Sequence, residues 1–189
     1  MASRFFGHLK TVITHRRAVR KLCRKAGIPW AGLRHDLSKY SPTEFSAGVR
    51  YYAGGVKSPN ENERAALGYS RAWLHHKGRN RHHFEYWTDY NPAEHRVMPI
   101  EMPLRYVAEL ICDRVAASKT YQKENYTNAY PLAYFDRGRQ NRVIHPATSA
   151  LIEEMLTLLA EQGEDAAFAE LRRRLRAEKQ RKKTPPRSI

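Results

Sequence analysis

The chain of 189 residues is long enough for one domain with a full hydrophobic core and short for two. Its hydrophobic content of 41% and its eleven Tyr and three Trp exclude wholesale disorder, while its net charge of +15 allows nucleic acid or small anionic molecules as partners. Because no segment approaches twenty apolar residues and the first residues lack a secretory leader, we expect a cytoplasmic protein without a membrane partner.

The first predicted helix covers residues 4–26, where apolar side chains recur every three or four positions. His15 lies inside this apolar stripe, and Gly27 and Pro29 end the helix. The next segment carries the adjacent pair His35 and Asp36. A second helix begins at 41–44, where Ser, Pro, Thr and Glu supply an N-cap, a proline in the first turn and a capping-box glutamate, and it should end near the glycines at 54–55.

A third helix is expected from 60 to 77, with Gly78 as its terminator. On this helix His76 shares a face with three other largely apolar positions, whereas His75 points about 100° away, so His76 is the better candidate for an inward role. A short helix should begin at His82 and His83 and should be broken at 89–92.

Pro103 opens a helix to about residue 120, with Asp113 at the margin of its apolar side. Two closing helices, 146–161 and 164–179, are separated by Gly163. No alternation typical of strands is present. The pattern therefore predicts an all-α, single-domain helical bundle over residues 1–171, followed by a basic helix end and tail at 172–189.

Four residues suit a metal site if the fold brings them together: His15, His35, Asp36 and Asp113. Imidazole nitrogens and carboxylate oxygens bind divalent transition metals at about 2.0 to 2.2 Å, and such an ion activates water at neutral pH. A lone histidine on an apolar stripe is usually a core residue, but a buried group of carboxylates is costly without a cation. His8, His95 and His145 belong to no such set, and we interpret them as packing or surface residues. Cys23 and Cys112 form no CxxC pair, which indicates buried, reduced thiols.

The order of these residues resembles the HD-domain metal-dependent phosphohydrolase superfamily over roughly residues 8–120. The segments HDLSKYSPTEF, AWLHHKGRNRHHFEYW and ELICDRVAAS are similar, more narrowly, to a bacterial and phage family of uncharacterised HD-like proteins with HDLSK and HHxGRNxHHxEYW motifs. The resemblance implies a helical bundle of the HD-domain type. It also implies that His15, His35, Asp36 and Asp113 are ligands of a first metal and that Asp36 bridges to a second metal where one is present.

The same resemblance implies catalytic roles for Lys39, His76 and either His82 or His83, with a slight preference for His83. These residues match side chains that hold a second metal or contact the substrate phosphate. The chain departs from the superfamily at Thr11, which stands one helical turn before His15 where some members with two metals carry a glutamate. This departure favours a site with one ion.

The leading hypothesis is a metal-dependent phosphohydrolase that acts on a nucleotide or another small phosphoester through a metal-activated water. Asp36 or a nearby histidine would orient that water, which gives Asp36 a catalytic role as well. Nitrogen-rich ligation favours Mn, Fe, Co, Ni or Zn and disfavours Mg. Two alternatives stay open. One is a nucleic-acid-binding protein that uses the basic segment from Arg172, where nine Lys or Arg stand against Glu178 alone. The other is a di-iron oxygenase on the same scaffold, because a fold does not determine its chemistry.

Overall fold

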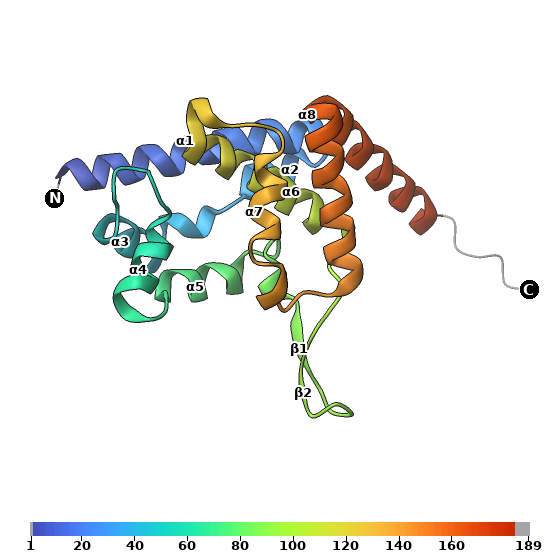
Figure 1. Cartoon of the computed structure of the whole chain (residues 1–189), viewed down its shortest axis with the longest axis horizontal. Helices are drawn as coiled ribbons and strands as arrows, with labels where there is room; N and C mark the ends of the chain where they lie inside the picture. Colours follow the sequence, from blue (N-terminus) through green and yellow to red (C-terminus); the bar gives the residue numbers. More distant parts are fainter. Residues whose placement is uncertain (1, 184–189) are drawn as a thin grey trace, which may run out of the picture.

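The central helix of the fold is α1 (Ala2–Ala26), whose buried side chains follow the predicted spacing of three and four residues. The computed structural model describes residues 2–183. Helix α1 packs against α2 (Pro29–Arg34) and against the long helix α6 (Leu104–Gln122). Figure 1 shows α1 along one edge of the molecule, with the smaller helices α3 to α5 beneath it.

The prediction of an all-α, single-domain bundle is confirmed, since helices dominate the described residues. The remaining α-helices are α3 (Pro42–Arg50), α4 (Pro59–Leu67), α5 (Arg71–Arg79), α7 (Tyr130–Asp136) and α8 (Pro146–Lys183). Four short 3-10 helices connect them: η1 (Leu37–Tyr40), η2 (Phe84–Tyr86), η3 (Lys123–Asn125) and η4 (Arg139–Asn141). None of the helices in residues 2–183 is both long and apolar enough to cross a membrane.

The hydrophobic core lies between α1, α6 and α8. Val19 of α1, Ile111 of α6 and Leu156 of α8 are almost completely buried there. Helix α8 bends at Gly163, whose φ of 82° and ψ of 179° are not helical, so the predicted division of this segment into two helices is correct. Its second half continues to Lys183, and the rest of the predicted basic tail, 184–189, lies outside the described residues.

The expectation of one helix over 60–77 is wrong, because the segment forms two helices. Gly68 adopts a left-handed conformation (φ 79°) that ends α4, and the Ser70 side chain accepts a hydrogen bond from the Trp73 amide to begin α5. Ser58, rather than Asn60, caps α4, and Gly78 lies inside α5, which ends at Arg79. Helix α3 begins as predicted at the Ser41 cap but ends at Arg50, before the two glycines.

A β-hairpin that no sequence pattern indicated is formed by β1 (Thr88–Asn91) and β2 (Arg96–Pro99). The strands pair antiparallel, with Thr88 opposite Pro99 and Asn91 opposite Arg96. None of their side chains is buried and half are exposed, so the alternation that marks a half-buried strand is missing. Figure 1 shows the hairpin projecting from the helical body. The expected α-helix at 82–87 is in fact the short 3-10 helix η2, preceded by the two histidines in extended or turn conformation.

Candidate metal centre

The sharp turn between α2 and η1 places His35 and Asp36 side by side at the centre of the site. Asp36 has a φ of 51° and a ψ of 32°, a left-handed conformation that aspartate tolerates better than most residues. Arg16 of α1 holds the turn from behind, because its Nε donates to the His35 carbonyl at 2.8 Å and its Nη2 donates to the Leu33 carbonyl at 3.1 Å. Both His35 and Asp36 are 1% exposed, so neither group can be satisfied by solvent.

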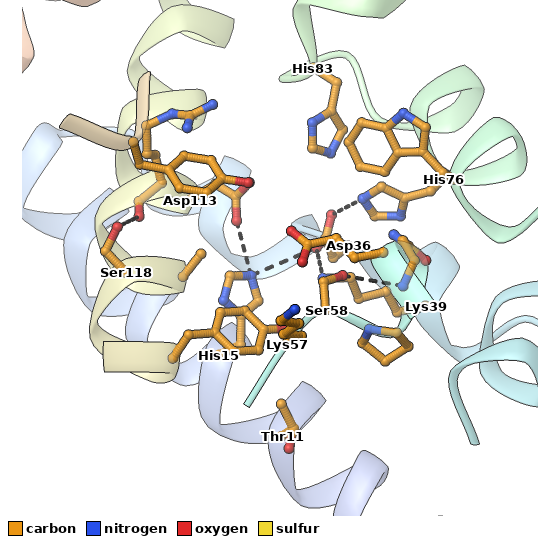
Figure 2. Close-up of a pocket in the computed structure, with 18 of the residues that line it drawn as sticks. Thr11, His15, Asp36, Lys39, Lys57, Ser58, His76, His83, Asp113 and Ser118 are labelled. Carbon is orange, nitrogen blue, oxygen red and sulfur yellow. Dashed lines mark hydrogen bonds and ion pairs between the residues drawn. The ribbon is translucent and has the colours of Figure 1, made fainter. Parts of the chain in front are cut away.

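Residues from α1 and α6 reach the same point. His15 Nε2 lies 3.0 Å from Asp113 Oδ1 and 3.8 Å from Asp36 Oδ2. His35 Nε2 lies 3.3 Å from Asp36 Oδ2 and 3.5 Å from Asp113 Oδ1. The structure therefore brings together the four residues predicted as ligands of the first metal. Figure 2 shows Asp36 between His15 and Asp113 on one side and His76 and His83 on the other.

On that second side, histidines approach the other oxygen of Asp36. His76 Nε2 from α5 lies 3.3 Å from Asp36 Oδ1, and His82 Nε2 lies 3.4 Å from the same oxygen. His83 completes a second group, with its ring centroid 4.8 Å from that of His76. The inward choice of His76 over His75 agrees with its burial, whereas both His82 and His83 face the site, so the preference for His83 alone is too narrow.

The geometry of these atoms fits a bound cation better than a hydrogen-bond network. Within each of the two groups, one ligand atom from every residue lies within 4.8 Å of the others. The groups share Asp36, and their members are His15, His35, Asp36 and Asp113, and Asp36, His76, His82 and His83. Several of the atoms that converge are buried and make no hydrogen bond with any described residue: His15 Nε2, His35 Nε2, Asp36 Oδ1, His82 Nε2 and His83 Nε2. Because buried polar atoms are seldom left unpartnered, these groups could hold a metal ion.

The expectation of a site for one ion rested on Thr11, although His76 and His82 or His83 matched side chains that hold a second metal in some members. Thr11 Oγ1 donates to the Gly7 carbonyl of its own helix, so it contributes no ligand. The second group draws its ligands from α5 and from the turn before η2 instead. The described residues thus offer donor sets for two neighbouring ions that would share the Asp36 carboxylate.

Two carboxylates that the sequence pattern did not single out orient the histidines. His35 Nδ1 donates to Glu109 Oε1 at 3.0 Å, and His82 Nδ1 lies 3.3 Å from the same oxygen. His76 Nδ1 donates to Glu44 Oε2 at 2.7 Å. An imidazole that carries its proton on Nδ1 has its Nε2 lone pair available for the centre, as metal ligation requires.

The sequence positions of Glu44 and Glu109 show why their contacts with the histidines were not predicted. Glu44 has the position of a capping-box residue, but its side chain bonds to His75 and His76 instead of to the helix end. Glu109 lies four residues before Asp113 and so shares its helix face, a spacing that could have identified it.

The charges at the site are strongly coupled. Burial opposes charge on Asp36, yet His35, Lys39 and His76 hold the pKa of its carboxyl well below the usual range. Asp113 behaves in the same way, because His15 and His35 lower its pKa against the effect of burial. Burial and the neighbouring His82 and His76 charges lower the pKa of His83. Both carboxylates are therefore ionised at neutral pH, and His83 is a neutral imidazole able to ligate.

Members of both ligand groups line a cavity of about 920 Å³. His15, Asp36 and Asp113 line it together with the three residues predicted to be catalytic beyond Asp36, namely Lys39, His76 and His83. Lys39 Nζ lies 2.7 Å from Asp36 Oδ2, and the nearby carboxylates raise the pKa of its ammonium group although burial opposes this. Figure 2 shows Lys57 and Ser58, from the loop before α4, beside His15 and opposite His83.

The histidines interpreted as packing or surface residues lie outside both ligand groups. His95 is exposed in the hairpin, and His8 is buried but absent from either donor set, although it lines the cavity. Burial lowers the pKa of His8 to about 4, so its ring is neutral at physiological pH. Cys23 and Cys112 are buried, free thiols, as predicted.

Most of the chain matches a protein-family model. A family model described as "Family of unknown function (DUF5662)" matches residues 4–158, which include every residue of the two ligand groups. No curated protein and no solved structure matches the chain significantly.

Proposed function

The chain belongs to DUF5662, a family of unknown function, and from its site we propose that it is a metal-dependent phosphohydrolase of the HD-domain type that acts on a nucleotide or another small phosphoester. One observation carries the proposal. The Asp36 carboxylate belongs to two sets of mostly buried donors and lines a cavity large enough for a small molecule. Two neighbouring ions that share a carboxylate are a common arrangement for displacement at phosphorus.

The donor set limits which ions fit. Histidine nitrogens match or outnumber carboxylate oxygens in both groups, which favours Mn, Fe, Co, Ni or Zn over Mg. An ion bound there would lower the pKa of a coordinated water and so supply a nucleophile at neutral pH.

The remaining side chains have roles that follow from their positions. The Lys39 ammonium group lies beside Asp36 and faces the cavity, where it would balance negative charge on the phosphoryl oxygens. His76 and His83 also line the cavity, and they would form part of its wall beside the reacting group. Glu44 and Glu109 act through the histidines that they orient, so they are positioning residues.

The proposal is tested by the metal content and phosphoester hydrolysis of the purified chain. We expect at least one equivalent of a transition metal and metal-dependent release of phosphate from a panel of nucleotides and simple esters. His35→Ala and Asp36→Ala should lose bound metal and, by roughly 100-fold or more, kcat/KM, while keeping the helical circular dichroism signal. His95→Asn is the matched control, because His95 is exposed, lies outside both ligand groups and has a φ of 49° that asparagine tolerates.

Two results would contradict the proposal. Hydrolysis that survives unchanged in folded Asp36→Ala would place the chemistry elsewhere. Oxygen consumption by the iron-loaded protein, without phosphate release from any ester, would instead favour the di-iron oxygenase that the sequence left open.

A further inference from the structure

The cavity that the ligand groups border is also lined by arginines, three of which we call the arginine arm: Arg114 of α6, Arg137 just after α7, and Arg142 just after η4. Because none of the ligand groups includes them, the phosphohydrolase proposal does not explain why three guanidinium groups face one cavity.

The guanidinium groups of the arginine arm lack carboxylate partners. Within residues 2–183, none of the three forms an ion pair within 4.0 Å, and Arg114 Nε is buried without a hydrogen-bond partner. Arg139 in the same segment behaves differently, since it pairs with Asp136 and Glu153 outside the cavity. Carboxylates act on the arm from beyond ion-pair distance: Asp113 and Glu85 on Arg114, and Asp136 and Glu85 on Arg142.

Aromatic rings hold the arginine arm in place. The Arg142 guanidinium lies 3.9 Å from the centroid of the Phe135 ring, Arg114 lies 5.3 Å from that of Tyr134, and Arg137 lies 5.7 Å from that of Tyr130. All three rings belong to α7. A guanidinium stacked on a ring keeps its N–H edges free, and a planar fork of donors is well suited to bind phosphate oxygens in pairs.

Electrostatics at the arm favour an anion. Burial and the neighbouring Arg114 charge lower the pKa of Arg142, which shows that the two cations destabilise each other in a partly desolvated place. The candidate metal centre has its own cation, Lys39, next to Asp36, so it does not need the arginine arm to bind one phosphoryl group. The cavity of about 920 Å³ leaves room beyond that group for the rest of a substrate.

We propose that the arginine arm binds a second phosphoryl group of the substrate, so that the preferred substrates are small molecules with at least two phosphoryl groups, one bound at the metal centre and the other at Arg114, Arg137 and Arg142. This inference deepens the proposed function and rests on it for the identity of the bond that is cleaved. The anion-binding property of the arm itself does not depend on catalysis.

Binding is tested by titrating the full chain with inorganic pyrophosphate in EDTA, where no metal-dependent turnover occurs. Wild type and Arg139→Ala should bind pyrophosphate equally, and Arg142→Ala and Arg137→Ala should each bind it roughly tenfold more weakly, as expected when one charge-assisted hydrogen bond is removed. Arg142→Lys should fall between them, because lysine keeps the charge without the fork. Arg137 is exposed, so its variant should fold even if truncation of Arg142 disturbs Phe135.

Turnover provides the second test. The ratio of kcat/KM for a substrate with two phosphoryl groups to that for p-nitrophenyl phosphate should fall roughly tenfold in Arg142→Ala and stay unchanged in Arg139→Ala. Equal pyrophosphate binding by Arg137→Ala, Arg142→Ala and Arg139→Ala would overturn the inference, as would no binding by wild type. If pyrophosphate binds as expected but no ester is hydrolysed, the proposed function fails while the anion site stands. If hydrolysis requires Asp36 but pyrophosphate binding does not depend on the arginine arm, the proposed function stands and the anion site fails.

Discussion

The conformation of Asp36 accounts for much of the candidate site. A left-handed residue immediately after His35 reverses the chain, so the two adjacent side chains approach the same centre from a single turn. Non-glycine residues in this region are strained, and such strain persists only where surrounding contacts enforce it. Arg16 supplies these contacts through the carbonyls of His35 and Leu33. Arg16, the residue after His15 in α1, therefore fixes the backbone of the turn that carries His35 and Asp36. His15 faces the side chains of that turn.

Glu109 provides a prediction at this scale. Glu109→Gln keeps the size of the side chain but removes the charge that holds the Nδ1 protons of His35 and His82. Because outer partners of metal-bound histidines typically contribute 10-fold to 100-fold in affinity, we expect Zn²⁺ or Mn²⁺ to bind roughly 10-fold to 100-fold more weakly. Competition with a metal indicator measures this.

The control for Glu109 is Glu161→Gln, a change at an exposed position of α8 that should leave the metal affinity at the wild-type value. The free energy of unfolding in EDTA shows whether Glu109→Gln destabilises the metal-free fold, which separates an effect on stability from an effect on the orientation of the ligands. An unaltered affinity in a folded Glu109→Gln protein would show that the carboxylate does not orient the ligands.

The residues of the candidate site were predictable in unequal measure. His15 and Asp113 stood out because histidine and aspartate are unusual on or beside apolar faces, and His35 and Asp36 stood out as an adjacent pair. The structure places the four together. The choice between His82 and His83 was not open to sequence reasoning, since no helical period governs the turn in which they lie. Glu44 had an ordinary explanation as a helix cap, so its contact with His76 emerged only from the packing of α3 against α5.

At the scale of elements, the long amphipathic helices were predicted well and the short ones poorly. Helices α1 and α6 span many turns, so their apolar stripes are unmistakable. Helices α2 and α7 have 6 and 7 residues, too few for a period to appear, and tertiary contacts stabilise them. The break at Gly68 was missed because an isolated glycine is often tolerated within a helix.

Gly32 yields a prediction about the packing of α2 on α1. A Cβ at this position would lie 2.6 Å from Cys23 Cβ and 3.1 Å from the Arg20 Cα, closer than such atoms approach. Gly32→Ala should therefore push α2 away and lower the free energy of unfolding by about 1–3 kcal/mol. Since α2 leads directly into His35, metal affinity should fall as well. Chemical denaturation and metal titration measure the two effects.

Gly78→Ala is the matched comparison for Gly32→Ala. Gly78 lies inside α5 with no atom within 4 Å of an added Cβ, so alanine should stabilise that helix by about 0.5–1 kcal/mol. Equal stability of the two variants would show that α2 can shift without cost.

At the scale of the whole molecule, fewer basic side chains of the C-terminal segment are available to bind a partner than the sequence suggests. Many cations of the second half of α8 already have partners: Arg173 and Arg174 bind Glu170, Arg174 also binds Glu154, and Lys182 pairs with Glu178. Arg172 Nε donates to the Lys25 carbonyl at the end of α1, and Leu171 is buried in the core. The first part of the basic segment thus attaches α8 to the bundle, and nucleic-acid binding remains a hypothesis for the residues beyond it.

Removal of residues 177–189 tests this division of the basic segment. The truncation keeps Leu171, Arg172 and the partly buried Leu175, so the melting temperature and the metal-dependent hydrolysis should match those of the full chain. It deletes five Lys or Arg against one Glu, so any retention on DNA should become weaker and less salt-dependent. The slope of log K against log salt should change by about 0.9 for each DNA phosphate that the deleted cations neutralise.

Melting curves, turnover and a salt series on immobilised duplex DNA give the three readouts. If the truncated protein binds DNA with the affinity of the full chain, the charge of this segment serves solubility. If the truncated protein folds but loses hydrolytic activity, the end of α8 assists the candidate site.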